Sequence, residues 1–133
     1  MSNQYYIPYF TQYELACRQT GKIVLAEGFT EKLLELRNKF NKPMVITSCC
    51  RSKKYNYTIG AAANAFHIYD HPRYDFTGYC AIDIAVKDPT NKGNLLSLAW
   101  QLGWSIGFHK NFLHLDRKVD YTELKQIVFG YAK

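Results

Sequence analysis

Apolar side chains recur at helical spacing in the first third of the chain. Four of them follow one another at intervals of three or four residues: Phe29, Leu33, Leu36 and Phe40. This spacing is typical of a helix with one buried face. The pattern predicts a helix that has Thr30 as its N-cap and ends before Pro43. A second helix is predicted over residues 94–102, since Gly103 is a natural residue directly after a helix end.

Strict alternation predicts strands in two other segments. Within residues 79–86, Ala81, Asp83 and Ala85 share one face and three β-branched residues share the other. Residues 112–116 repeat this pattern, and His114 and Asp116 point to the same face as Phe112. A carboxylate between small residues has open space in front of it, so this face is a candidate site.

Further short elements complete the expected fold. Strands are predicted over residues 44–47 and 104–108, a short helix over residues 12–18, and an amphipathic segment over residues 121–129. Together these elements predict an α+β fold, in which helices pack on one side of a small antiparallel sheet. The length of 133 residues is room for one domain, residues 1–133, with a single core.

Composition narrows the class of protein. Hydrophobic residues make up 47% and charged residues 21%, which excludes a disordered tail. No segment approaches the roughly 20 apolar residues of a membrane span, and the first residues lack a signal peptide pattern, so we expect a soluble monomer without membrane insertion. The net charge of +6 and the 11 tyrosines fit a nucleic acid partner, an anionic polymer such as cell wall, or solubility alone.

Four cysteines bear on redox state and metal binding: Cys17, Cys49, Cys50 and Cys80. Adjacent cysteines such as Cys49 and Cys50 rarely bridge each other without strain. The chain has no CxxC pair, so a structural zinc site built from cysteines is not expected. We expect all four thiols to be reduced and mostly buried.

The predicted strands also suggest a metal site. Asp83 and His114 lie on neighbouring strands, and His67, at the end of an alanine-rich loop, is the obvious third ligand. Three nitrogen or oxygen ligands with an open fourth position are typical of catalytic zinc. The alternative from the residues alone is that these side chains are surface groups or hydrogen-bonded core residues.

Four blocks of sequence carry a family resemblance. They are SCCRSKKYN at 48–56, ANAFH at 63–67, AIDI at 81–84 and FLHLDR at 112–117. In this order they resemble the M15-type zinc D-alanyl-D-alanine peptidases, which are related in fold to hedgehog signalling domains. The closest branch is carboxypeptidase-like and also includes small phage cell-wall enzymes. The resemblance implies that His67, Asp83 and His114 bind Zn²⁺ and that peptidoglycan peptides are the substrate.

Two further site residues follow from the resemblance. Arg51 matches an arginine that anchors the substrate near the scissile carbonyl or its terminal carboxylate, and a guanidinium grips a carboxylate with two parallel hydrogen bonds. His109 matches a histidine that steadies the negative charge developing during attack on the peptide bond. The implied chemistry is polarisation of the carbonyl by zinc and a lowered pKa of its bound water.

This sequence departs from the family pattern in its ligand spacing. The family usually places its ligand aspartate about seven residues after the first histidine, whereas Asp83 follows His67 by sixteen, with residues 68–76 resembling an insertion. Asp70 and His71, within that insertion, are therefore rival ligands. We favour Asp83 because the rivals lie in a polar excursion and not on a strand.

A second departure concerns the general base. Several relatives have an acidic residue three positions before the last histidine ligand, where this chain has Asn111, and an asparagine cannot accept a proton from water. Asp116 is the local substitute, although a carboxylate at this place can also serve to orient the His114 imidazole.

Several smaller expectations concern exposure. Arg117 and Lys118 are expected to be exposed to solvent at the end of a strand, and Trp100 and Trp104 to lie in the core. Some tyrosines near His67 are expected to line a cleft. The basic run from Arg51 is read as a solvated face, although nucleic-acid binders also interleave aromatic and basic residues.

The sequence thus leads to a first hypothesis and two alternatives. The first is a zinc peptidase that hydrolyses stem peptides of peptidoglycan, as a D,D-carboxypeptidase or endopeptidase, in a phage lysis or virion protein. The second is a zinc-binding module of the same fold that has lost catalysis, and Asn111 is the feature that favours it. The third is a basic nucleic-acid-binding domain.

Overall fold

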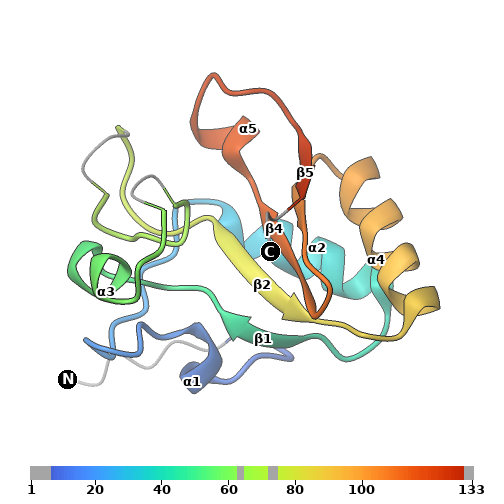
Figure 1. Cartoon of the computed structure of the whole chain (residues 1–133), viewed down its shortest axis with the longest axis horizontal. Coiled ribbons are helices and arrows are strands. Elements are labelled where there is room, and N and C mark those ends of the chain that lie inside the picture. Colours follow the sequence, from blue (N-terminus) through green and yellow to red (C-terminus); the bar gives the residue numbers. More distant parts are fainter. Residues whose placement is uncertain (1–6, 63–64, 72–74, 131–133) are drawn as a thin grey trace.

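A five-stranded sheet forms the centre of the computed structural model, which describes residues 7–62, 65–71 and 75–130 (Figure 1). The strands are β1 (Val45–Ser48), β2 (Ala81–Ala85), β3 (Ser105–Phe108), β4 (Phe112–Asp116) and β5 (Val128–Gly130). The helices are α1 (Gln12–Leu15), α2 (Phe29–Phe40), α3 (Lys53–Thr58), α4 (Pro89–Gln101) and α5 (Lys118–Tyr121). The strand order is β1-β2-β4-β3-β5, and every pair except β3 with β5 is antiparallel. The α+β fold is therefore confirmed, with one parallel pair added to the expected sheet.

The register between β2 and β4 separates the sheet into two faces. Ile82 lies opposite Leu115, and Ile84 opposite Leu113, and all four are buried in the core. The next positions along the strands face the other way, so that Asp83 lies directly opposite His114. One face of these two strands therefore consists of aliphatic side chains, and the other presents the polar residues of the candidate site.

Two helices pack against each other and enclose the aliphatic face. Leu33 and Leu36 of α2 and Leu95 and Ala99 of α4 are fully buried. In Figure 1, α2 lies behind β2 and β4, on the side away from the viewer. The opposite face of the sheet is thereby left for the polar residues of β2 and β4.

Both long helices begin earlier than the sequence predicts. Phe29 is the first residue of α2, and Gly28 at the N-cap adopts a left-handed backbone conformation with φ of 86° and makes no side-chain cap, so the expected cap at Thr30 is wrong. The carboxylate of Asp88 caps α4 by accepting the N–H of Asn91. The start of α4 was missed because residues 90–93 carry no apolar side chain that would extend the helical spacing, although Pro89 is a typical residue for the first turn.

The C-terminal segment also differs from its prediction. Residues 121–129 were expected as one amphipathic segment, but the chain forms the short α5 and then the strand β5. Contacts distant in sequence determine this path: the side-chain amide of Gln126 donates to the carbonyls of Trp100 and Trp104, and the N–H of Ile127 donates to the Ser105 hydroxyl. These hydrogen bonds hold β5 alongside β3.

Three exposure predictions are wrong. Trp100 is 42% exposed on α4, whereas Trp104 is fully buried as expected and meets Phe29 edge to face at 5.6 Å between ring centroids. Arg117 and Lys118, expected at the surface, are 3% and 7% exposed. The Arg117 guanidinium is held inside because it donates to the Asp120 carboxylate and lies over the Trp104 ring.

The loop that carries His67 is tied to the end of β1. The N–H of Arg51 donates to the His67 carbonyl and the N–H of Tyr69 donates to the Arg51 carbonyl, both at 2.8 Å. Residues 63–64, which belong to one of the blocks of the family resemblance, lie outside the described residues, as do residues 72–74 of the insertion. Backbone pairing thus places His67 beside the sheet.

All four cysteines are buried and unbridged, as the sequence predicts. Burial raises the pKa of Cys49 and of Cys50 to about 12, so both are neutral thiols at physiological pH. None of the described helices has the length and apolar character needed to cross a bilayer.

Candidate metal centre

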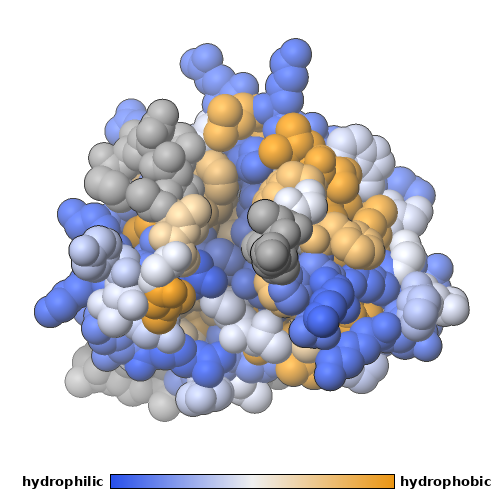
Figure 2. Space-filling view, viewed as in Figure 1, coloured by the Kyte–Doolittle hydropathy of each residue, from blue (hydrophilic) through white to orange (hydrophobic). Residues whose placement is uncertain are grey.

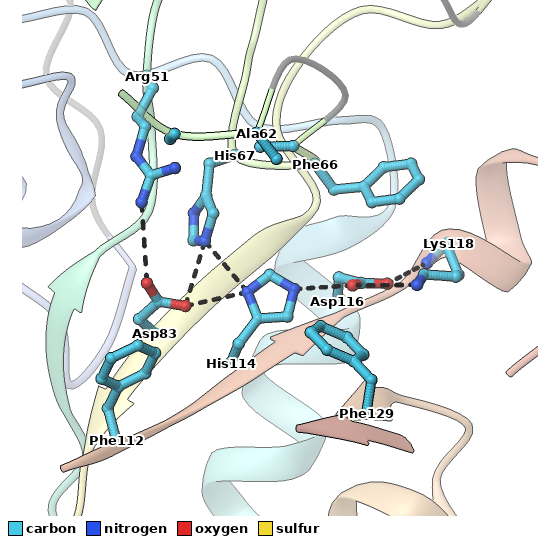
Figure 3. Close-up of a pocket in the computed structure, with 12 residues that line it drawn as sticks. Arg51, Ala62, Phe66, His67, Asp83, Phe112, His114, Asp116, Lys118 and Phe129 are labelled. Atoms are coloured by element: carbon cyan, nitrogen blue, oxygen red, sulfur yellow. Dashed lines mark hydrogen bonds and ion pairs between the residues drawn. The ribbon is translucent and has the colours of Figure 1, made fainter. Parts of the chain in front are cut away.

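Three side chains converge on the polar face of the sheet, as Figure 3 shows. Asp83 comes from β2, His114 from β4 and His67 from the preceding loop, and all three are buried. Asp83 Oδ1 lies 3.2 Å from His67 Nε2 and 3.0 Å from His114 Nδ1, and the two ring nitrogens are 3.2 Å apart. These three atoms form a nearly equilateral triangle.

Hydrogen bonds on the outer side of each ring decide where the protons lie. His67 Nδ1 contacts the carbonyl oxygen of Cys49 at 2.6 Å, and His114 Nε2 contacts Asp116 Oδ2 at 2.8 Å. Both partners accept, so each outer nitrogen must donate its proton. In the neutral rings the two inner nitrogens, His67 Nε2 and His114 Nδ1, then carry lone pairs that point toward each other and toward the Asp83 carboxylate.

Three converging lone pairs require a positive charge between them. Burial lowers the pKa of His67, so this ring is neutral. Burial also acts to lower the pKa of His114, but hydrogen bonds to Asp116 and Asp83 outweigh it and raise this pKa to about 9. Burial would raise the pKa of Asp83, yet the two histidines hold it well below its usual range. The centre therefore attracts a cation, whether a proton on His114 or a metal ion.

The spacing of the triangle suits zinc. In a tetrahedral site with bonds of about 2.0 Å, two ligand atoms are about 3.3 Å apart. The three separations of 3.0–3.2 Å are close to this value. His67, Asp83 and His114 are also the group of three His, Cys, Asp or Glu side chains within the described residues that could hold a metal ion. The residues present thus fit a zinc ion with one open position.

Comparison with known protein families gives one match. A family model described as Peptidase M15 matches residues 8–116 of the 133-residue chain. The chain belongs to the peptidase M15 family. A search of curated proteins and a search of solved structures each found no match. The match to the M15 family begins well before the blocks that carry the resemblance and includes α1 and α2.

The triangle of this M15 domain opens into a pocket of about 420 Å³. One wall is formed by the loop before β2, with Ala61, Ala62, Ala65 and Phe66, and the opposite wall by Phe112, Lys118 and Phe129. Figure 2 shows the surface hollowed between these two walls. None of the described tyrosines lines the pocket, contrary to our expectation, and Tyr79 instead lies in the core.

Arg51 lies at the Asp83 end of the pocket. Its guanidinium donates to the Ser48 hydroxyl at 2.9 Å and to the Asn56 side-chain oxygen at 3.2 Å. One of its nitrogens is 3.8 Å from Asp83 Oδ2. These contacts fix the direction of the side chain, and α3, which the sequence did not predict, supplies one of them through Asn56.

Asp116 is placed behind the His114 ring and not in front of it. Its Oδ2 accepts from His114 Nε2, and its Oδ1 accepts the backbone N–H of Lys118 at 3.0 Å. The ring therefore separates Asp116 from the converging ligand atoms. This position favours the orienting role over that of a general base.

His109 lies in the turn between β3 and β4, outside the pocket lining. Its ring stacks on that of Phe112 at 4.3 Å between centroids, and its Nδ1 accepts the N–H of Asn111 at 3.1 Å. In the neutral ring the proton is then on Nε2. Lys92 fixes the turn because its ammonium donates to the His109 carbonyl.

The rival ligands of the insertion have other contacts. Asp70 accepts the N–H of Lys53 at the start of α3, at 2.7 Å, and the ring of His71 meets that of Phe76 edge to face. Neither belongs to the group of three converging ligands.

Lys118 and Phe129 line the pocket, and the sequence analysis missed both as site residues. Phe129 was missed because β5 pairs with a strand more than twenty residues earlier, which no local pattern indicates. A signal for Lys118 was present: it follows Asp116 by two positions, so strand alternation continued past β4 would have placed it on the site face.

Substitution of Asp116 by asparagine is expected to weaken zinc binding by about 10- to 100-fold, because the His114 ring loses its charged acceptor. The measurement is a competition titration of zinc against a chromophoric chelator. Asp88→Asn is the matched control: it removes one carboxylate at the start of α4, where asparagine is an equally good cap. Equal affinities for wild type and Asp116→Asn would show that the carboxylate does not support the ligand.

Proposed function

We propose that this M15 domain is a zinc peptidase that hydrolyses stem-peptide bonds of bacterial peptidoglycan, as a D,D-carboxypeptidase or endopeptidase. The observation that carries the proposal is the triangle of His67 Nε2, Asp83 Oδ1 and His114 Nδ1, in which the outer hydrogen bonds of the two rings leave their inner lone pairs directed at the Asp83 carboxylate. The membership of the peptidase M15 family supports it.

The ligand set gives the reaction type. When bound, zinc supplies Lewis-acid chemistry, namely polarisation of a carbonyl group and acidification of water. The hydrolysis adds water across the amide, so that the C–N bond breaks, the acyl carbon gains a hydroxyl group and the leaving nitrogen gains a proton. His67, Asp83 and His114 would hold the ion at the wall of the pocket, where a peptide carbonyl could enter.

Two further residues have roles in the proposal. Arg51, held by Ser48 and Asn56, presents its guanidinium to the pocket and would anchor the substrate through a carboxylate or the scissile carbonyl. His109 carries its proton on Nε2 in the neutral ring and would donate it as a hydrogen bond to the oxygen on which negative charge develops.

A metal-binding module without turnover is the second candidate function. Asn111 favours it, because an asparagine stands where several relatives have an acidic residue. The described residues that line the pocket include two carboxylates, Asp83 and Asp116. Asp116 is engaged through both oxygens, and Asp83 belongs to the triangle. An acidic group dedicated to accepting the proton of water is therefore not evident among the described lining residues.

The test compares zinc content with hydrolysis. We expect one zinc ion per chain, and release of D-alanine or cleavage of cross-linked muropeptides by the zinc-loaded protein, measured by mass spectrometry. A chelator should abolish the products and added zinc should restore them. One bound zinc without any product would contradict the peptidase and leave the module, and absence of zinc binding would contradict both. Salt-sensitive DNA or RNA binding that persists in His114→Ala would favour the third hypothesis.

A further inference from the structure

Lys118 is a buried cation at the inner wall of the pocket. Its side chain is 9% exposed, and its ammonium lies 5.5 Å from the ring centroids of both Phe66 and Phe129. Figure 3 shows the side chain beside Asp116, with the Phe66 and Phe129 rings on either side of the pocket. Burying a lysine is costly unless its charge is compensated, so its place in this pocket calls for an explanation.

Compensation by the protein is incomplete within the described part of the chain. The nearest carboxylate oxygen, Asp116 Oδ2, is 3.8 Å from the ammonium, which is beyond hydrogen-bonding distance. Both Asp116 oxygens already accept other hydrogen bonds, from His114 and from the backbone of Lys118 itself. Asp116 is thus satisfied as an acceptor without the ammonium. The ammonium has three N–H groups and lies at the wall of the cavity.

The charged groups of the site form a chain of contacts in which cationic and anionic side chains alternate. Arg51 lies 3.8 Å from Asp83, Asp83 lies 3.0 Å from His114, His114 lies 2.8 Å from Asp116, and Asp116 lies 3.8 Å from Lys118. Arg51 and Lys118 are therefore the two ends of this chain of contacts, and Figure 3 shows them on opposite sides of the triangle. A peptide bound across the triangle therefore has a cation on each side of its scissile bond.

We propose that Lys118 binds a carboxylate of the substrate at the end of the pocket opposite Arg51. This inference rests on the proposed peptidase function and specifies its substrate class. With the terminal carboxylate of the peptide at Arg51, Lys118 faces the acyl side of the scissile bond. The substrate is then a peptide with a free carboxylate on that side. The Phe66 and Phe129 rings exclude water around the ammonium and so strengthen the contact.

The experiment uses two non-hydrolysable stem-peptide analogues with the same sequence. One carries free side-chain carboxylates on the acyl side, as in a diaminopimelate-containing peptide, and the other carries carboxamides at the same positions. Equilibrium binding to the zinc-loaded full chain is measured by calorimetry. We expect wild type to bind the carboxylate analogue at least about 10-fold more tightly, and Lys118→Met to lose this preference.

Lys125→Met is the matched control. It removes the same charge from an exposed position between α5 and β5 and should keep the preference. Zinc stoichiometry and a thermal melt establish that each variant folds. Since the wild-type preference is measured without any variant, the inference remains testable even if Lys118→Met does not fold.

The outcomes separate this inference from the proposed function. Equal binding of the two analogues by wild type, or binding of neither, overturns the role of Lys118. Equal weakening of both analogues in Lys118→Met assigns the residue to the support of Asp116 and also overturns it. A preference that depends on Lys118, without hydrolysis of the cleavable peptide, keeps the inference as a binding specificity and contradicts the peptidase.

Discussion

Replacement of His114 by alanine is expected to lower the zinc affinity of the protein by about 100- to 1,000-fold. The estimate assumes that a total binding free energy of about 10–16 kcal/mol divides among four ligands, or about 2.5–4 kcal/mol for each. The substitution removes one vertex of the triangle and leaves the lone pairs of His67 and Asp83 without the third donor. Competition titration against a chelator of known affinity measures the change.

His71→Ala is the matched control for this prediction, and it also tests the rival ligand. His71 lies in the insertion and packs against Phe76, so its loss should leave zinc affinity within about a factor of two of wild type. A large loss of zinc in His71→Ala, with His114→Ala close to wild type, would contradict the assignment of the ligands.

Substitution of Gly78 by alanine is expected to lower the free energy of unfolding by about 2–6 kcal/mol. Gly78 adopts a positive φ of 100°, and a Cβ there would lie 2.4 Å from the backbone nitrogen of Ala26 and 2.6 Å from the carbonyl carbon of Leu25. Backbone atoms cannot move aside as a flexible side chain can. Thermal and urea unfolding with two probes measures the loss.

Gly21→Ala separates the cost of a positive φ from the cost of steric overlap at the new Cβ. Gly21 has a similar positive φ of 73°, but a Cβ there meets nothing within 4 Å. This variant should therefore lose about 1–2 kcal/mol, the cost of the left-handed conformation alone. If the two variants were equally destabilised, close packing between residue 78 and the segment at Ala26 would not contribute to stability.

The main elements of the fold and the positions of Asp83 and His114 could be predicted from local periodicity in the sequence, whereas His67 lies in a loop that has no such period. Alternation along residues 79–86 and 112–116 was sufficient to put Asp83 and His114 on one face, and the register of β2 with β4 makes them direct partners. The 3.6-residue spacing from Phe29 to Phe40 likewise indicated α2, with its start two residues too late.

The remaining features depend on contacts that the local pattern does not contain. Arg117 and Lys118 look like surface residues by composition. Their burial follows from the ion pair of Arg117 with the nearby Asp120, and from Trp104 and the pocket rings, which lie on other elements. The parallel pairing of β5 with β3 depends on hydrogen bonds from Gln126 and Ile127 to residues more than twenty positions away. Such non-local pairings are not visible in any sequence window.

The division of β2 and β4 into two faces has a consequence for how this domain can evolve. The aliphatic residues Ile82, Ile84, Leu113 and Leu115 pack into the core, and the reactive groups occupy the alternate positions. Changes at sites that share no contacts have nearly additive effects on stability. Natural selection can therefore vary the chemistry of one face while the other continues to maintain the fold. A lineage that lost its catalytic step would still inherit a folded domain.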